Sequence, residues 1–176
     1  MKKIKLYIAA SLDGYIARPD GDIEWLTGYP NPSKSDYGYK DFLTTVDTVV
    51  MGGRTYRDIL CMDVIWPYKG MDTYVISHHT WENKEDIRFI TENIVETVAG
   101  LREKEGKDIW LVGGGEIISM LLDADLVDEL QIFYMPVMLG DGIRLFPSNK
   151  QKEAQWNLLE SKSYDNGVLE AKYQRK

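Results

Sequence analysis

Cysteine is almost absent from the sequence, whose 176 residues include only Cys61. One cysteine cannot form an internal disulfide, and the first residues show no apolar signal segment, so we expect a cytoplasmic protein. No apolar run approaches the roughly 20 residues that a membrane-spanning helix requires. Low-complexity tracts and internal repeats are also missing, which argues against disorder. The length is sufficient for one buried core and short for two, so we expect a single domain over residues 1–176.

Positive charge is scarce as well. The chain has 21 Lys and Arg against 28 Asp and Glu, a formal net charge of -7. A negative protein repels nucleic acid and anionic membrane surfaces, so we expect neither as a partner. An anionic ligand would have to be held by a locally positive site. This balance favours a small-molecule pocket.

The stretch Ile109–Leu122 carries the pattern around which we organise the chain. Ile109–Val112 is a short apolar run that suits a strand buried on both faces of a parallel sheet. The glycines at 113–115 then allow a sharp turn and the close approach of another group. Glu116 favours a first helical turn, and the apolar residues that follow share one helix face: Ile117, Ile118, Leu121 and Leu122. This junction can hold phosphate at a helix start, or its glycines can serve only close packing; the pattern leaves both open.

Two further strands end in comparable junctions. Thr48–Met51 runs into Gly52-Gly53-Arg54-Thr55, and Thr73–Ser77 is followed by His78. The carboxyl ends of parallel strands meet at one edge of a sheet, where α/β proteins bind dinucleotides. We therefore expect these groups to line one ligand site.

The remaining segments complete an alternation of helices and strands. We predict strands over Met1–Ala10, Ile87–Thr91 and Glu129–Met138, a long loop over Arg18–Ser35, a helix from an N-cap at Ser35 to Val46, a helix over Val95–Glu105, and a hairpin of Trp156–Tyr164 with Val168–Gln174. Helices that alternate with strands, followed by a final hairpin, predict an α/β protein with a mostly parallel sheet and an antiparallel edge.

Several motifs together resemble those of the dihydrofolate reductase superfamily, and more closely the reductase domain of bifunctional riboflavin-biosynthesis deaminase-reductases. The matching segments are Ser11–Ala17, Val49–Tyr56, Val112–Gly115 and Pro136–Phe146, in the family order. The resemblance implies a dihydrofolate reductase-like three-layer fold, in which helices flank a mostly parallel central sheet with an antiparallel C-terminal edge hairpin. It also implies a homodimer.

The resemblance implies NADPH as the cofactor and assigns its contacts. Nicotinamide would be flanked by Ala9 and Ile16, and the phosphates and adenosine ribose would meet Gly52, Gly53, Arg54 and Thr55. The 2'-phosphate would lie near Ser77 and His78. The pyrophosphate would be cradled by Gly113, Gly114, Gly115, Glu116 and Ile117. Arg54 would supply the positive charge that an acidic protein needs for a 2'-phosphorylated cofactor.

The substrate implied is a small heterocycle, either pterin- or folate-like or similar to 5-amino-6-(5-phosphoribosylamino)uracil. Asp36 falls where dihydrofolate reductases keep the acid that binds the pterin, and a partly buried carboxylate there could be catalytic. Alternatively, Asp36 is a surface acid that stabilises a helix start. Phe133 stands where a hydroxyl residue usually orients that acid, which points to another substrate. The alternative function is that of a protein, such as a sensor, that binds NADPH without turnover.

Other polar residues are given structural roles. His78 and His79 are adjacent and point to opposite faces of an extended chain, so we expect no metal site. Cys61 has no recognisable catalytic partner. Asp13 is expected to stabilise a turn with Gly14.

Overall fold

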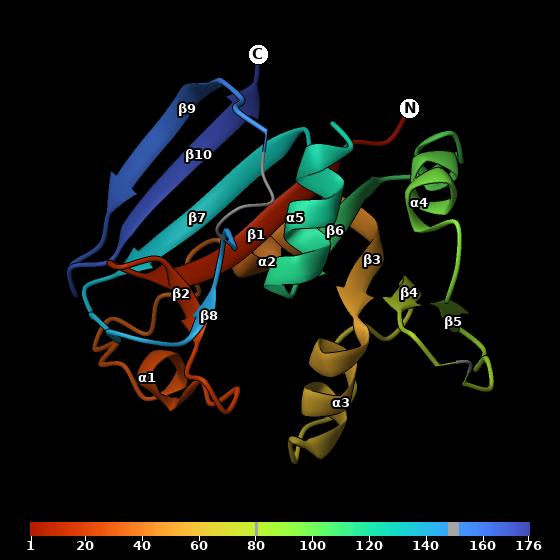
Figure 1. Cartoon of the computed structure of the whole chain (residues 1–176). Helices are drawn as coiled ribbons and strands as arrows, with labels where there is room; N and C mark the ends of the chain where they lie inside the picture. Colours follow the sequence, from red (N-terminus) through yellow and green to blue (C-terminus); the bar gives the residue numbers. More distant parts are fainter. Residues whose placement is uncertain (80, 148–151) are drawn as a thin grey trace.

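The computed structural model describes residues 1–79, 81–147 and 152–176. Eight strands form one sheet in the order β5-β4-β3-β6-β1-β7-β10-β9 (Figure 1). Their bounds are Ile4–Ser11 (β1), Val46–Gly52 (β3), Asp72–Ile76 (β4), Ile87–Ile90 (β5), Asp108–Gly113 (β6), Glu129–Met135 (β7), Trp156–Ser163 (β9) and Leu169–Arg175 (β10). The first six strands in this list pair in parallel, whereas β10 is antiparallel to both β7 and β9. The predicted mostly parallel sheet with an antiparallel hairpin at its edge is confirmed.

Helices cover both faces of the sheet and make three layers. Side chains of α4 (Ile94–Arg102) and α5 (Gly115–Asp123) belong to the large apolar cluster on one face. Side chains of α2 (Tyr39–Thr44) and α3 (Gly53–Cys61) belong to the cluster on the other face. A short helix, α1 (Glu24–Thr27), and a two-stranded antiparallel ribbon of β2 (Tyr15–Ala17) and β8 (Ile143–Arg144) complete the elements.

The central strand β1 contributes to both layers because successive side chains point to opposite faces. Ile4 and Leu6 are fully buried in the cluster with α4 and α5. Tyr7 points to the other face, where its ring stacks on Phe42 of α2 with a centroid separation of 4.5 Å. β1 lies between β6 and β7, so the functional segments at its end lie in the middle of the sheet.

The predicted helix start at Ser35 was wrong. The helix α2 begins at Tyr39, because Tyr37 and Gly38 have left-handed backbone angles (φ 52° and 76°) that interrupt a right-handed helix. Ser35 instead accepts the backbone N–H of Tyr37 at 3.1 Å in a local turn. The helix also ends at Thr44, since Val46 already pairs with β6.

The long loop and the C-terminal hairpin follow the prediction with small changes. Within the loop, Glu24–Thr27 forms a single helical turn, α1. In the hairpin, Gly167 adopts φ 86°, a conformation that favours glycine, and Tyr164 donates its backbone N–H to Val168 at 2.9 Å. None of the helices in the described ranges has the length and apolar content needed to span a bilayer.

Candidate functional site

The three glycine- and serine-bearing strand ends lie side by side at one edge of the sheet. Parallel pairing sets Gly52 of β3 opposite Ile76 of β4, and Met51 opposite Gly113 of β6. Each strand therefore ends at the same level, followed directly by α3, by Ser77 or by α5. The expected meeting of these groups at one edge is present in the structure.

Close packing between the segments shows why glycine is needed at several of these positions. A Cβ atom added at Gly53 would lie 3.2 Å from Ser77 Oγ, and one added at Gly52 would lie 3.2 Å from Ile117 Cγ1. Both separations are tighter than ordinary van der Waals contact. At Gly114, in contrast, the described residues beyond its chain neighbours bring only Thr55 Oγ1 near an added Cβ, at an unstrained 3.7 Å. Gly52 and Gly53 thus serve packing, whereas Gly114 borders open space.

Two helices begin at this edge. Gly52 is the N-cap of α3 and Gly114 is the N-cap of α5, and neither start has a side-chain cap among the described residues. The first backbone N–H groups of a helix have no partner within it, and the helix dipole makes this end positive. The edge therefore offers N–H donors from two helices to an anion.

Charged and polar side chains around the edge are accessible. Arg54 and His78 are exposed, and Ser77 accepts the backbone N–H of His79 at 3.2 Å. The Arg54 guanidinium lies against Gly21 of the long loop, 3.0 Å from the position of an added Cβ. Arg54 forms no ion pair with any described residue, so its charge is available to a ligand. Glu116 is exposed at the start of α5 and adds a negative charge there.

The residues expected around nicotinamide lie one strand further along the sheet. Ile8 of β1 approaches Gly113, with its Cδ1 atom 3.6 Å from an added Cβ, so Ala9 lies close to the level of the glycine turn. Ile16 of β2 packs against the cluster that contains α5, while Ala9 packs with Phe133 on the opposite face. The structure therefore places Ala9 and Ile16 on different faces of the same edge.

An aromatic cluster, made of Tyr7, Tyr37, Phe133 and Tyr164, lies on the Ala9 face and was missed by the sequence analysis. The rings of Tyr7 and Phe133 are 4.8 Å apart, and those of Tyr37 and Tyr164 are 4.9 Å apart. The cluster is an apolar wall of the kind that contacts a flat heterocycle. The only sequence signal for it was the hairpin that brings Tyr164 back to β7.

A buried carboxylate, also missed, borders this cluster. Glu170 of β10 is 8% exposed and accepts the Tyr164 hydroxyl at 2.7 Å and the Gln131 amide at 2.6 Å. Burial is the largest cause of the raised pKa values of Tyr7 and Tyr164, and the nearby Glu170 carboxylate is the second. Both phenols therefore stay neutral. Glu170 lies opposite Phe133 because β10 pairs with β7, and no local sequence motif predicts that pairing.

A catalytic role led us to expect a partly buried Asp36, but the structure does not show this burial. It is exposed, and its two carboxylate oxygens accept the backbone N–H groups of Gly38 at 3.1 Å and Lys40 at 3.2 Å. Hydrogen bonds from Lys40 and then Gly38 lower the pKa of Asp36, so this carboxylate is ionised at neutral pH. Its observed contacts match those of a residue that stabilises the turn into α2.

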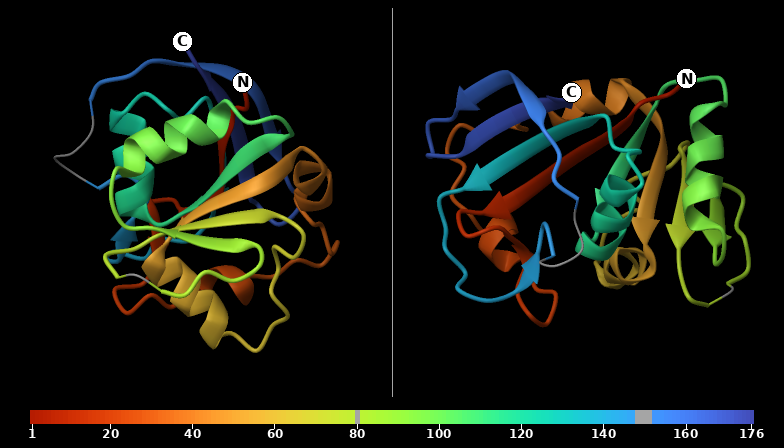
Figure 2. Two further views of the ribbon diagram at one scale, coloured as in Figure 1. Left: turned by 90° about the vertical axis from the view of Figure 1, so that its right-hand side faces the viewer. Right: turned by 45° about the horizontal axis from the view of Figure 1, so that its top comes forward.

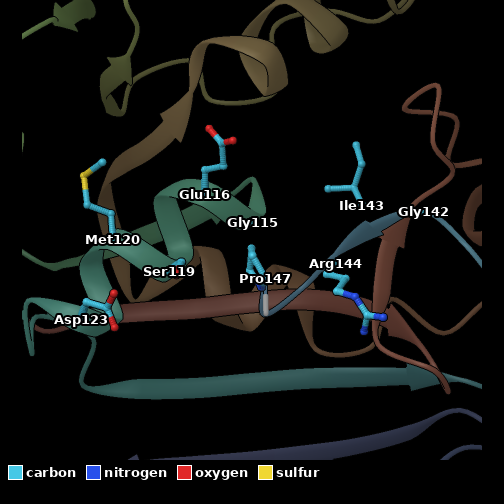
Figure 3. Close-up of a pocket in the computed structure, with 9 residues that line it drawn as sticks. All are labelled: Gly115, Glu116, Ser119, Met120, Asp123, Gly142, Ile143, Arg144 and Pro147. Atoms are coloured by element: carbon cyan, nitrogen blue, oxygen red, sulfur yellow. The ribbon is translucent and has the colours of Figure 1, made fainter. Parts of the chain in front are cut away.

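A groove of about 610 Å³ runs between α5 and the segment that carries β8 (Figure 3). Along α5 it is lined by Gly115, Glu116, Ser119, Met120 and Asp123. Two of these lining residues, Gly115 and Glu116, are also the first residues of α5. On the far side, the Arg144 side chain turns away from the helix and lies 5.0 Å from the centroid of the Tyr15 ring. No group of three or more His, Cys, Asp or Glu side chains suited to a metal occurs within the described ranges.

Comparisons with known proteins agree with this arrangement. The family model of the RibD C-terminal domain matches residues 2–169. The uncharacterized protein YwjB of Bacillus subtilis is 40% identical over 147 residues, which cover 82% of this chain and 83% of that protein. A crystal structure from Shewanella sp. PV-4, provisionally described as a riboflavin biosynthesis protein, has a TM-score of 0.88 and 31% identity, and covers 99% of both chains.

A dihydrofolate reductase shares the fold at lower identity. The enzyme from Enterococcus faecalis, solved in complex with NADP(H), has a TM-score of 0.71 and 16% identity, and covers 99% of this chain and 96% of that one. With the mostly parallel sheet, the antiparallel edge and the glycine-bearing strand ends described above, the fold is dihydrofolate reductase-like. The match over 168 consecutive residues settles the assignment: this chain belongs to the RibD C-terminal domain family.

Proposed function

We propose that this protein is an NADPH-dependent oxidoreductase that transfers a hydride to a small heterocyclic substrate. The observation that carries the proposal is the joint placement of three strand ends and two uncapped helix starts at one edge of the sheet. Such an edge suits the phosphates of a dinucleotide. Membership of a reductase family and the NADP(H) complex of the similar Enterococcus enzyme support the choice of cofactor.

The residues at the edge fit a dinucleotide in charge and in space. The open space beside Gly114 would give a phosphate access to the backbone N–H groups of Gly115 and Glu116, whereas Ile117 donates its N–H to the Gly114 carbonyl oxygen at 3.1 Å. Arg54, together with Ser77 and His78, would bind the adenosine 2'-phosphate through hydrogen bonds to an ionised group. Gly52, Gly53, Thr55 and Gly113 would shape the cradle around the phosphates. Ala9 and Ile16 would hold the nicotinamide end.

The chain would contribute position and environment to the reaction, because the cofactor, when bound, supplies the hydride. Phe133 and Tyr7 beside Ala9 would hold a flat substrate and exclude water. Tyr164 holds its proton on Oη, donated to Glu170. These contacts would fix the distance and orientation on which transfer depends. The substrate class remains pterin- or folate-like, or similar to 5-amino-6-(5-phosphoribosylamino)uracil, as the family resemblance implies.

The second candidate function is NADPH binding without turnover. One specific observation favours it: Asp36, the acid that the sequence matched to catalysis, is exposed and occupied by backbone donors. A pterin-like reaction that needs a buried acid would then lack it. The cofactor site is the same in both candidate functions.

Two measurements distinguish the reductase from the protein that binds NADPH without turnover. They also show whether the protein has neither function. Calorimetric titration with NADPH and NADH tests cofactor binding, and NADPH oxidation is followed with dihydropterins, ribosylaminopyrimidines and small carbonyl compounds. We expect tight NADPH binding, weaker NADH binding and turnover with one heterocyclic class. NADPH binding without turnover on every substrate favours the second candidate. Absence of NADPH binding contradicts both.

A further inference from the structure

The aromatic face beside Ala9 contains four tyrosines, which are Tyr7, Tyr29, Tyr37 and Tyr164. A phenol hydroxyl has one proton to donate, and its oxygen can accept a hydrogen bond at the same time. The direction of the hydrogen bond that each hydroxyl makes therefore determines whether its proton remains available to a ligand.

Three of the four hydroxyls donate their protons within the fold. Tyr7 donates to the backbone carbonyl oxygen of Tyr37 at 3.1 Å, and Tyr29 donates to that of Asn166 at 3.0 Å. Tyr164 donates to the buried carboxylate of β10 described above, at 2.7 Å. Carbonyl oxygens and ionised carboxylates only accept, so each bond uses the proton of its tyrosine. None of these three protons is left for a ligand.

The hydroxyl of Tyr37 is bonded in the opposite direction. It lies 2.7 Å from Nδ2 of Asn166, in the turn of the C-terminal hairpin. The same Nδ2 donates to the carbonyl oxygen of Pro30 at 2.9 Å, and the amide oxygen accepts the backbone N–H of Val168 at 3.4 Å. Because a carbonyl only accepts and an N–H only donates, the orientation of the amide is fixed and Tyr37 is the acceptor. Among the residues that the structure describes, no acceptor takes the Tyr37 proton.

Tyr37 belongs to the aromatic cluster on which a substrate would lie. Its ring meets Phe133 and Tyr164 edge-on, with centroid separations of 6.1 and 4.9 Å, and its side chain is only partly buried. In Figure 2 (right) the orange loop between α1 and α2 runs past the turn of the blue hairpin, so Asn166 reaches a residue 129 positions away in the sequence. The hydroxyl is therefore held in place before a ligand arrives.

We propose that Tyr37 recognises the heterocyclic substrate by donating its hydroxyl proton to a carbonyl oxygen or ring nitrogen of that substrate, and that Asn166 is its positioning residue. The inference rests on the proposed function, since it concerns the substrate side of the same site. Asn166 fixes the hydroxyl and, because it is itself the donor in their hydrogen bond, leaves the Tyr37 proton to the ligand. A donor fixed in advance favours substrates that present an acceptor at that point.

The contact between Tyr37 and Asn166 could also serve only to attach the loop to the hairpin, and Asn166→Asp separates the two roles. A carboxylate accepts hydrogen bonds, so in this variant Tyr37 would donate its proton to the new side chain. The loop and the hairpin would stay joined, but the proton would be withdrawn from the ligand. Attachment alone therefore predicts substrate binding like that of the wild type. Recognition predicts that Asn166→Asp behaves like Tyr37→Phe.

The first test measures NADPH oxidation by the full chain with the heterocycle that the wild type turns over. We expect Tyr37→Phe and Asn166→Asp each to raise KM by roughly 3- to 10-fold with kcat nearly unchanged, as for the loss of one hydrogen bond to a bound substrate. The double variant should be no worse than either single variant, because both remove the same proton. Tyr29→Phe is the matched control: it removes a hydroxyl from the same loop that also contacts Asn166, but whose proton is already used, so KM should not change.

The second test needs no turnover. Calorimetric titration of the NADP⁺-saturated protein with a dihydropterin and with a ribosylaminopyrimidine should show the same weakening in Tyr37→Phe and Asn166→Asp, while NADPH affinity stays equal in all variants. Wild-type KM and affinity in either of these two variants, or an equal loss in Tyr29→Phe, overturns the role of Tyr37 and leaves the reductase intact. A wild type that binds NADPH but accepts no heterocycle in either assay contradicts the proposed function and this role together.

Discussion

The carboxylate of Asp13 accepts the backbone N–H of Gly140 at 2.7 Å, which joins the turn after β1 to the loop after β7. The same carboxylate accepts the hydroxyl of Ser11 at 2.6 Å and the backbone N–H of Leu139 at 3.1 Å. Asp13 therefore does more than stabilise its own turn. It holds together two segments that flank the candidate nicotinamide end of the site.

We expect Asp13→Asn to lower the melting temperature at neutral pH, because an amide cannot accept all of these hydrogen bonds. The Ser11 hydroxyl, followed by the Gly140 and Leu139 N–H groups, holds the pKa of Asp13 at about 2, below its ordinary value of 3.8. A lowered pKa stabilises the fold above the unfolded value and ceases to do so as the pH falls through the folded value. The difference between wild type and variant should therefore shrink from about pH 5 to pH 2, as followed by thermal denaturation. A constant difference over that range would contradict the pKa assignment.

Arg102 should be important for stability. Its guanidinium contacts both carboxylate oxygens of Asp128, at 2.8 and 3.0 Å, and Asp128 also accepts the backbone N–H of Ile4 at 2.8 Å. The pair is mostly buried, with the two side chains 13% and 27% exposed. We expect Arg102→Ala to lower the free energy of unfolding by about 2 to 4 kcal/mol, since it leaves a largely buried carboxylate without its cation. Urea denaturation measures the change.

Arg88 provides the matched control. It forms a similar contact with Asp72 at 3.1 Å, but the two side chains are 48% and 53% exposed. Ion pairs in this setting contribute about 0 to 1 kcal/mol. Arg88→Ala should therefore cost much less than Arg102→Ala. Equal losses would mean that burial does not determine the contribution of these pairs.

The parts of the fold that could be predicted are those with local patterns. The buried strands, the glycine turns and the final hairpin each have a spacing or composition that fixes their type, and the structure confirms them. The predicted start of α2 was wrong because Ser35 and Asp36 have the composition of a helix cap. The left-handed backbone at Tyr37 and Gly38 ends that cap early, and apart from the glycine itself the sequence has no recognisable signal for it.

The candidate site divides in the same way. The edge formed by Gly52, Gly114 and Ser77 follows from strand direction alone, so sequence could place it. The aromatic cluster and Glu170 depend on which strand pairs with which and in what register. That information comes from tertiary packing, which a single sequence does not carry locally.

Arg54 should determine the preference for NADPH over NADH. Its exposed guanidinium lies at the start of α3 without an ion pair among the described residues, so a 2'-phosphate would gain a charge-assisted hydrogen bond. Such a bond contributes about 1.5 to 3 kcal/mol. We expect Arg54→Gln to weaken NADPH by roughly 10- to 150-fold in calorimetric titration and to leave NADH nearly unchanged. Arg57→Gln, which alters an exposed arginine about one turn further along α3, is the control. Equal losses for both cofactors would remove the 2'-phosphate role.

Asp36→Asn tests the remaining catalytic hypothesis. Because Asp36 is exposed and bonded to the N–H groups of Gly38 and Lys40, we expect a lower melting temperature, unchanged NADPH affinity and nearly unchanged turnover. A catalytic acid predicts a different result, namely a turnover reduced by about 100- to 10,000-fold with the melting temperature maintained. Calorimetry and thermal denaturation give the first two quantities without any substrate, and NADPH oxidation adds the third.

The adjacent glycines Gly114 and Gly115 should respond to substitution in opposite ways. At Gly114 the backbone is extended (φ -76°, ψ -172°), and among the residues that the structure describes an added Cβ meets only Thr55 Oγ1, at 3.7 Å. Gly114→Val should therefore change the free energy of unfolding by less than about 1 kcal/mol. Its side chain would fill the space that a pyrophosphate needs, so NADPH affinity should fall by at least about 100-fold, corresponding to the loss of one or two charge-assisted hydrogen bonds.

Gly115 is the counterpart in which the packing role dominates. A Cβ there would overlap the carbonyl oxygen of Arg144 and lie 3.4 Å from Pro147 Cγ. Backbone atoms cannot give way as a flexible side chain can, so Gly115→Ala should lower the free energy of unfolding by about 1 to 3 kcal/mol. Urea denaturation and NADPH titration of both variants make the comparison. A folded Gly114→Val protein with wild-type affinity would show that the pyrophosphate lies elsewhere, and an unfolded one would mean that Gly114, like Gly115, is required for packing.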